Sequence, residues 1–212
     1  GGLGSPTALY LAASGVGHII IADFDQVELS NLQRQIIHGT SDIGDDKVDS
    51  AKAKMLEINP NIKVTIANEI VHTDNLSSLI KDVDVVLDGT DNFESRFEIN
   101  KVCVDHKKPL VSAAVIRFEG QVSVFKGYEK DQPCYQCLYT EEGDDNESCV
   151  QNGVLAPVAG LIGTIQALQA IKVILSLGDE LCGTLLLVDG LDLSFRKVKI
   201  GKDLKCPICN SN

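Results

Sequence analysis

The chain has 212 residues and a formal net charge of -11, and it contains no Trp. Phosphate contacts need clustered Lys and Arg, so this acidic balance argues against a nucleic-acid-binding protein. A chain of this length can bury a core without disulfides, and it suits one large α/β domain.

The first half of the chain alternates predicted helices and strands. Pro6 suits the first turn of a helix at 5–14, which Ser5 can cap. The β-branched run at 18–22 is typical of a strand covered on both faces. The further elements are a helix at 47–58, a strand at 62–67, a helix at 74–81, a buried strand at 83–87, a helix at 93–107 and a strand at 109–114. This alternation predicts a doubly wound α/β fold with a mostly parallel sheet.

The pattern changes after residue 117. Residues 119–126 alternate as a half-exposed strand would, and 140–148 form an acidic loop. The apolar stretch that follows carries polar residues, so it predicts a buried helix at 157–177 rather than a membrane span. Strands at 184–189 and 194–200 complete the chain as an antiparallel pair. We therefore expect one domain, 1–212, with a Rossmann-like first part (1–117) and a second, differently patterned part (118–212).

The opening Gly1-Gly2-Leu3-Gly4 precedes a predicted helix and matches the last part of the pattern G-x-G-G-x-G. Such glycines let the backbone approach a phosphate at a helix N-terminus, although a plain strand–helix turn gives the same pattern. Asp23 ends the next strand, where an acid can accept hydrogen bonds from ribose hydroxyls; a solvated strand end is the alternative. We expect the chain to be N-terminally truncated, because the strand that should lead into the glycines is missing. That strand would fill an open position beside 18–22 and 83–88.

A cluster of polar and basic residues follows the predicted ribose strand. Its members are Asn31, Arg34, Gln35 and Lys47. A triphosphate needs cations of this kind, whereas a simple dinucleotide dehydrogenase does not need two of them there. Asp91 follows a buried strand at the carboxyl end of the sheet, where a carboxylate beside a triphosphate can hold Mg²⁺. Each charged residue alone is more often a surface charge, but together these residues favour a nucleotide site.

Four segments resemble the MoeB/ThiF family, the bacterial relatives of ubiquitin-activating enzymes. They are GGLGS, DFDQVELSNLQRQ, DGTDNFESR and SCVQNGVLAPVAGLIGTIQALQAIK, and the resemblance covers essentially the whole chain. It implies that Asp23 holds the ribose, and that Asn31, Arg34, Gln35 and Lys47 meet the phosphates. It also implies that Asp91 binds Mg²⁺ and is the residue most needed for adenylation. The family resemblance further implies a homodimer in which a partner's N-terminal helix supplies an Arg.

Two C-x-x-C pairs, Cys134/Cys137 and Cys206/Cys209, predict a structural zinc site. Four thiolates leave no open coordination position, so this zinc should clip the chain together rather than act in catalysis. Disulfides are the alternative, which a cytoplasmic setting disfavours, and we expect a cytoplasmic protein because no signal or membrane segment is evident. The family resemblance agrees with zinc.

The remaining cysteines differ in character. Cys103 and Cys182 are typical of buried small residues. Cys149 follows the acidic loop, outside any apolar periodicity. In the thiamine branch of the family the matching Cys can form a covalent sulfur link to the carrier, whereas in the molybdopterin branch it is dispensable. An idle loop thiol is therefore the alternative to a role in sulfur transfer. The four His residues form no catalytic constellation.

The predicted reaction is ATP-dependent adenylation of a small ubiquitin-like sulfur-carrier protein. Its C-terminal glycine carboxylate, at the end of a Gly-Gly tail threaded beneath 140–153, attacks the α-phosphorus of ATP, and pyrophosphate leaves. A carboxylate needs no general base, so catalysis is positioning plus charge stabilisation by Mg²⁺, Arg34 and Lys47. A sulfur donor, either a cysteine desulfurase or a rhodanese-type protein, would then convert the adenylate to a thiocarboxylate.

Several alternatives stay open. The stretch 114–121 favours a molybdopterin-type carrier over the thiamine-pathway carrier ThiS. An NAD-dependent oxidoreductase predicts an acid/base pair near a nicotinamide, and none is evident. An inactive binding half of a heterodimeric activator would leave Asp91, Arg34 and Lys47 idle. The tRNA-modifying dehydratases share the nucleotide motifs, but the two C-x-x-C pairs disfavour them.

Overall fold

The structure is a computed structural model that describes residues 1–139 and 153–210. In chain order, the helices and strands are α1 (Gly4–Ala13), β1 (His18–Ala22), η1 (Leu29–Asn31), η2 (Thr40–Asp42), α2 (Lys47–Ile58), β2 (Lys63–Ala67), α3 (Thr73–Ile80), β3 (Val86–Asp88), α4 (Phe93–Asp105), β4 (Leu110–Ile116), β5 (Glu119–Phe125), η3 (Tyr135–Cys137), α6 (Ala156–Leu175), β6 (Thr184–Asp189) and β7 (Ser194–Lys199).

The strands form two sheets. β1 and β2 pair in parallel, with His18 opposite Lys63. The second sheet has the order β3-β4-β5-β6-β7; β3 and β4 are parallel, and every later pair is antiparallel. A direct turn at 117–118 joins β4 to β5, which forces these neighbours to run in opposite directions. The predicted α/β class and the antiparallel β6–β7 pair are confirmed, but "mostly parallel" describes only strands β1 to β4.

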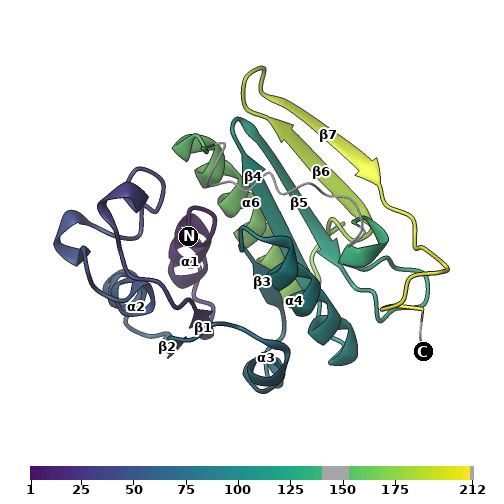
Figure 1. Ribbon diagram of the computed structural model, residues 1–212, viewed down its shortest axis with the longest axis horizontal. Helices are drawn as coiled ribbons and strands as arrows, with labels where there is room; N and C mark the ends of the chain where they lie inside the picture. The colour runs from purple at the N-terminus through teal and green to yellow at the C-terminus, as the bar shows by residue number, and fades with distance from the viewer. Residues whose placement is uncertain (140–152, 211–212) are drawn as a thin grey trace.

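The helices cover both faces of the larger sheet. α6 packs across β4 and β5 on one face and also against α1, whereas α4 lies on the other face beside β3 (Figure 1). The main core fills the space between α1, α6 and the sheet, with Val111, Val122 and Ile162 fully buried. The start of α1 is therefore held against the middle of the fold.

α6 is the one helix among the described residues that is long and apolar enough to cross a membrane. Val158, Ile162 and Ala170 on this helix are nevertheless buried against the sheet and α1. Burial of this kind agrees with the predicted core helix.

Three local predictions are wrong. β1 was expected to be covered on both faces, but its central residues are only half-buried, and β2 is its only paired strand among the described residues. The strand at 119–126 was expected to be half-exposed, yet most of β5 is buried, since α6 covers one face and residues 135–139 approach the other. Ser5 does not cap α1; its hydroxyl donates to the carbonyl oxygen of Gly1 at 2.8 Å, and the helix begins at Gly4.

The separation of the two sheets falls between β1 and β3, which are not paired with each other among the described residues. This is the position at which an additional strand was expected. No strand of the described residues occupies it.

Candidate functional site

The glycine loop and its neighbours lie at the edge formed by the carboxyl ends of β1 and β3. Gly1 and Gly2 precede α1, and a Cβ added to Gly2 would come within 3.3 Å of the Arg34 side chain. Asp23, directly after β1, lies beside the loop, with one carboxylate oxygen 3.8 Å from the nitrogen of Gly1. The predicted ribose acid and one predicted phosphate cation are therefore both at the glycine loop.

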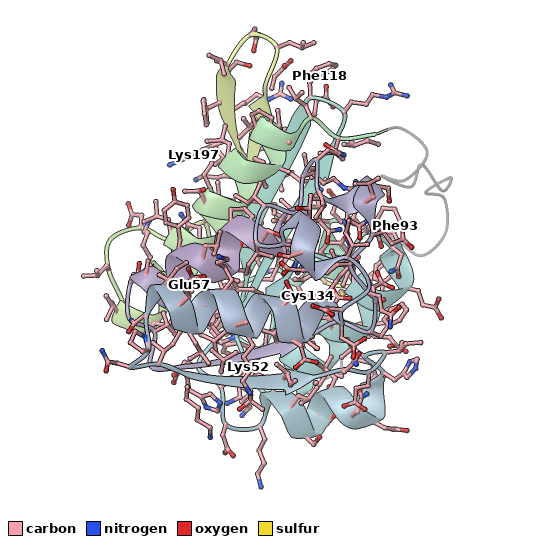
Figure 2. The ribbon with its side chains drawn as sticks, turned by 90° about the vertical axis from the view of Figure 1, so that its left-hand side faces the viewer. Lys52, Glu57, Phe93, Phe118, Cys134 and Lys197 are labelled. Carbon is pink, nitrogen blue, oxygen red and sulfur yellow. The ribbon has the colours of Figure 1, made fainter. Side chains whose placement is uncertain are left out.

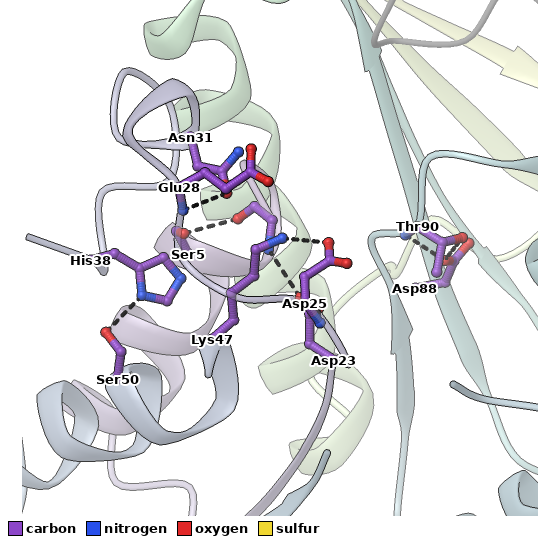
Figure 3. A network of polar contacts seen from close by, with 11 residues as sticks. Ser5, Asp23, Asp25, Glu28, Asn31, His38, Lys47, Ser50, Asp88 and Thr90 are labelled. Atoms are coloured by element: carbon purple, nitrogen blue, oxygen red, sulfur yellow. Dashed lines mark hydrogen bonds and ion pairs between the residues drawn. The ribbon is translucent and has the colours of Figure 1, made fainter. Parts of the chain in front are cut away.

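Lys47 opens α2 and points back to the same edge (Figure 3). Its ammonium nitrogen lies 2.6 Å from a carboxylate oxygen of Asp25, and its side chain is only 8% exposed. Asp25 was not among the predicted site residues, although the repeated acid in Asp23-Phe24-Asp25 is a usable signal. A buried ammonium group held in place in this way fits a phosphate ligand, because its position at the site is already fixed.

The segment between β1 and α2 carries the remaining predicted phosphate ligands. Asn31 is buried in η1, where its side-chain oxygen accepts from the backbone nitrogen of Glu28 at 3.3 Å. Arg34 donates to the Ser30 carbonyl at 3.3 Å. Gln35 is buried, and its side-chain oxygen has no hydrogen-bond partner in the described part of the chain.

The loop after β3 borders the glycine loop and leads to Asp91. A Cβ added to Gly89 would meet the Leu3 side chain at 3.5 Å and the Gly4 nitrogen at 3.7 Å. Asp91 itself is exposed, and no described residue bonds to its carboxylate. An exposed carboxylate at this strand end fits Mg²⁺, which proteins often hold through one or two carboxylates plus substrate phosphates.

Hydrogen bonds hold Thr90 from two sides, and they fix the backbone immediately before Asp91. The buried carboxylate of Asp88 accepts from the Thr90 nitrogen at 2.9 Å and from its hydroxyl at 2.7 Å, while its other oxygen accepts from Ser112 at 3.1 Å. The buried guanidinium of Arg96, on α4, donates to the Thr90 carbonyl at 3.2 and 2.5 Å. Neither Asp88 nor Arg96 was singled out from the sequence.

His38 is a further buried group near this edge. Its Nδ1 lies 2.8 Å from the hydroxyl of Ser50 on α2, which in turn donates to Asp42 at 3.0 Å (Figure 3). Burial lowers the pKa of His38 from 6.5 to about 4, so the ring is neutral near pH 7. His38 thus supports the α2 turn that carries Lys47, a contact that residue spacing alone did not indicate.

The four predicted zinc ligands meet at one point. The sulfur atoms of Cys134, Cys137, Cys206 and Cys209 all lie within 4.8 Å of one another, and the shorter separations are 4.0, 3.6 and 3.4 Å. A tetrahedral zinc with Zn–S bonds of about 2.3 Å needs sulfur separations of roughly 3.8 Å, so the four thiols fit this ion. The described cysteines are free thiols, which argues against the disulfide alternative.

The cluster is largely enclosed and joins distant parts of the chain. Cys134 lies in the interior (Figure 2), packed against Val104 of α4, and the Tyr135 nitrogen donates to Asn100 on the same helix at 2.9 Å. A hydrogen bond from Cys134 lowers the pKa of Cys137 to about 5, whereas the hydrogen bond to Cys137 and burial raise the pKa of Cys134. Cys137 is therefore the readier thiolate of this pair. Cys149 lies outside the described residues.

Sequence comparison with known proteins identifies the family of this chain. The model of the ThiF family matches residues 1–208. The chain belongs to the ThiF family. The molybdopterin-synthase adenylyltransferase of Escherichia coli (strain K12) is 42% identical over 209 residues, which are 99% of this chain and 84% of that protein. The enzyme of the same name from Haemophilus influenzae is 45% identical over 205 residues, covering 97% and 84%.

A solved structure gives the same fold. The crystal structure of E. coli MccB with MccA-N7isoAsn superposes with a TM-score of 0.85 at 25% identity. The match covers 100% of this chain but 65% of the MccB chain, so MccB has a considerable part that this ThiF-family chain does not match.

Proposed function

We propose that this ThiF-family chain adenylates the C-terminal carboxylate of a small ubiquitin-like sulfur-carrier protein, using ATP and releasing pyrophosphate. The observation that carries the proposal is the meeting of the glycine loop with Arg34 at one side and with the Asp91-bearing loop at the other. The names of the two bacterial relatives, both molybdopterin-synthase adenylyltransferases, support the same activity.

The residues divide the work of binding and charge stabilisation. Asp23 accepts from the ribose hydroxyls, and the glycine backbone approaches the phosphates at the start of α1. Arg34 and Lys47 offset the charge that builds on the phosphates as pyrophosphate leaves, with Asn31 and Gln35 as hydrogen-bonding neighbours. The carrier carboxylate is already a nucleophile near neutral pH, so no residue needs to act as a general base.

The proposed enzyme uses two metal ions, which have different roles. Mg²⁺ at Asp91 would neutralise phosphate charge and orient the triphosphate. Zn²⁺ held by the four thiols would be structural, because the protein ligands fill its tetrahedral shell.

The carrier is proposed to be the small subunit of molybdopterin synthase, in keeping with the relatives' names. The thiamine-pathway carrier ThiS is the second candidate. Residues 118–212 would receive the carrier, whose Gly-Gly tail would pass near 140–153. A homodimer, a cysteine desulfurase or rhodanese-type sulfur donor, and a cytoplasmic location complete the proposal. Family membership and the named relatives disfavour an NAD-dependent oxidoreductase or an inactive binding half.

The test is carrier-dependent ATP–pyrophosphate exchange by the full-length protein. Each candidate carrier is compared with a form that lacks its last glycine, which removes the proposed nucleophile from its position. Exchange with one intact carrier and background exchange with the shortened form would support the proposal. Equal exchange with and without any carrier would contradict it.

A further inference from the structure

Gln166 is a fully buried polar residue in the apolar helix α6, and only 1% of its surface is exposed. Its side-chain nitrogen donates to the carbonyl oxygen of Asp88 at 2.6 Å and to that of Val111 at 3.0 Å. The two carbonyls belong to the parallel strands β3 and β4. Two acceptors facing the nitrogen fix which end of the amide carries its two protons.

The other end of the same amide reaches the glycine-loop helix. The side-chain oxygen of Gln166 lies 3.1 Å from the hydroxyl of Thr7 on α1, which is also 2.8 Å from the Leu3 carbonyl and 2.9 Å from the Gly163 carbonyl. The hydroxyl has one proton, so it donates to one of these three oxygens at a time.

α1 and α6 can come this close because Gly163 has no side chain. A Cβ there would approach the Leu3 carbonyl oxygen to 2.4 Å and the Pro6 ring to 2.6 Å. The first turn of α1 therefore touches the backbone of α6 directly. Gln166 follows one helical turn later, with its amide between α1 and the carbonyls of Asp88, the last residue of β3, and Val111, near the start of β4.

We propose that Gln166 is a positioning residue for adenylation, which sets the spacing between the glycine loop and the Asp91 loop. This inference rests on the proposed function, since it assigns both loops to the nucleotide. The glycine loop is attached to α1, and Asp91 follows Asp88 by one short turn that is itself fixed through Thr90. One amide contacts both elements, through its nitrogen at the Asp88 carbonyl and its oxygen at the Thr7 hydroxyl, so its loss lets them move relative to each other.

An amide is needed at this position because the two strand carbonyls must each accept a hydrogen bond from a buried donor. Both carbonyls accept from the buried Gln166 amide, and an apolar side chain would leave them without this donor. A carboxylate would face them with like charge. The site therefore calls for two donors on one side and an acceptor for Thr7 on the other, which among uncharged side chains of this length only Gln offers.

The test uses Gln166→Met, which keeps the length and volume of the side chain but removes its hydrogen bonds, in the full-length enzyme. Gln169→Met is the matched control, because Gln169 is buried on the same helix but accepts from Leu181, away from the nucleotide edge. Both variants should lose thermal stability. Only Gln166→Met should lower kcat for carrier-dependent ATP–pyrophosphate exchange, by roughly tenfold to a hundredfold, with KM for ATP almost unchanged, since misplacing a group by about 1 Å is enough for such a loss.

Thr7→Val is a milder variant that breaks the link from the α1 side, and it serves if Gln166→Met does not fold. It should lower kcat roughly several-fold in the wild-type background. In a Gln166→Met background it should lower kcat little further. Equal kcat in the Gln166→Met and Gln169→Met proteins, or wild-type kcat in Thr7→Val, would overturn the inference alone. Wild-type exchange by Asp91→Ala in the same series would overturn the proposed function as well.

Discussion

The ammonium nitrogen of Lys47 lies 2.6 Å from the Asp25 carboxylate, and the Lys47 backbone nitrogen donates to the Asp25 carbonyl at 2.9 Å. The first residue of α2 is thereby fixed to the segment after β1. Both bonds keep the buried lysine at the edge that carries Asp23 and the glycine loop.

Replacing Lys47 should slow adenylation. Lys47→Ala should lower ATP–pyrophosphate exchange by about a hundredfold or more, because one charge on the phosphates is worth ~3 kcal/mol in the transition state. Lys54→Ala is the control on the same helix, since the Lys54 side chain is 44% exposed and its ion pair in the described part of the chain is with Glu57. Comparable exchange rates in the two variants would exclude a phosphate role for Lys47.

The second prediction concerns the four-thiol site. The protein purified without chelator should contain one zinc per chain by metal analysis, and Cys209→Ser should lose the metal and much of its thermal stability. Cys182→Ser should keep the zinc, because Cys182 lies outside the cluster. Absence of zinc from the wild-type protein would contradict the assignment.

The third prediction follows from the buried ring of His38. Its pKa is about 4 in the folded protein and 6.5 ordinarily, so the unfolded chain binds the proton more readily between these values. Stability from the neutral ring is therefore complete above about pH 6.5 and is lost as the pH falls toward 4.

Urea unfolding at pH 7 and pH 5 measures this loss. Between these pH values the wild-type protein should lose about 1–2 kcal/mol more than His38→Gln, which cannot take up the proton. His72→Gln should behave as the wild type does, because His72 is exposed. Identical pH dependence of the wild type and His38→Gln would mean that the ring is not buried in its neutral form.

The fourth prediction separates adenylation from sulfur transfer. Cys149→Ala should leave ATP–pyrophosphate exchange nearly unchanged, because the carrier carboxylate attacks ATP without a thiol. Only thiocarboxylate formation could suffer, and mass spectrometry of the carrier after incubation with a sulfur donor would detect it. A folded Cys149→Ala protein without exchange would contradict this division.

Local patterns predicted the elements well because periodicity and glycine positions act over a few residues. The bounds of β1 and α2 agree with those predicted. The four sulfur atoms of the two C-x-x-C pairs lie together, as their spacing predicted. Burial was predicted less well. The β-branched run of β1 gives no indication of how many strands lie beside it, so its half-exposure could not be inferred.

The residues that support the site through tertiary contacts could not be predicted from the sequence either. Asp88, Arg96 and Gln166 act through backbone groups, and any residue can supply a carbonyl or an amide nitrogen. Such partners are set by tertiary placement, with 78 positions separating Gln166 from Asp88. Sequence motifs found the residues that would face the nucleotide, whereas those that fix its loops needed the structure.

The most direct test of the central claim is ATP–pyrophosphate exchange by full-length Asp91→Ala in the presence of the carrier. Asp84→Ala is the control, because Asp84 is an exposed acid before β3, away from the strand end that carries Asp91. The proposed role of Asp91 in adenylation predicts that Asp91→Ala keeps its fold and loses exchange, while Asp84→Ala exchanges at the wild-type rate. Near wild-type exchange by a folded Asp91→Ala protein would contradict it.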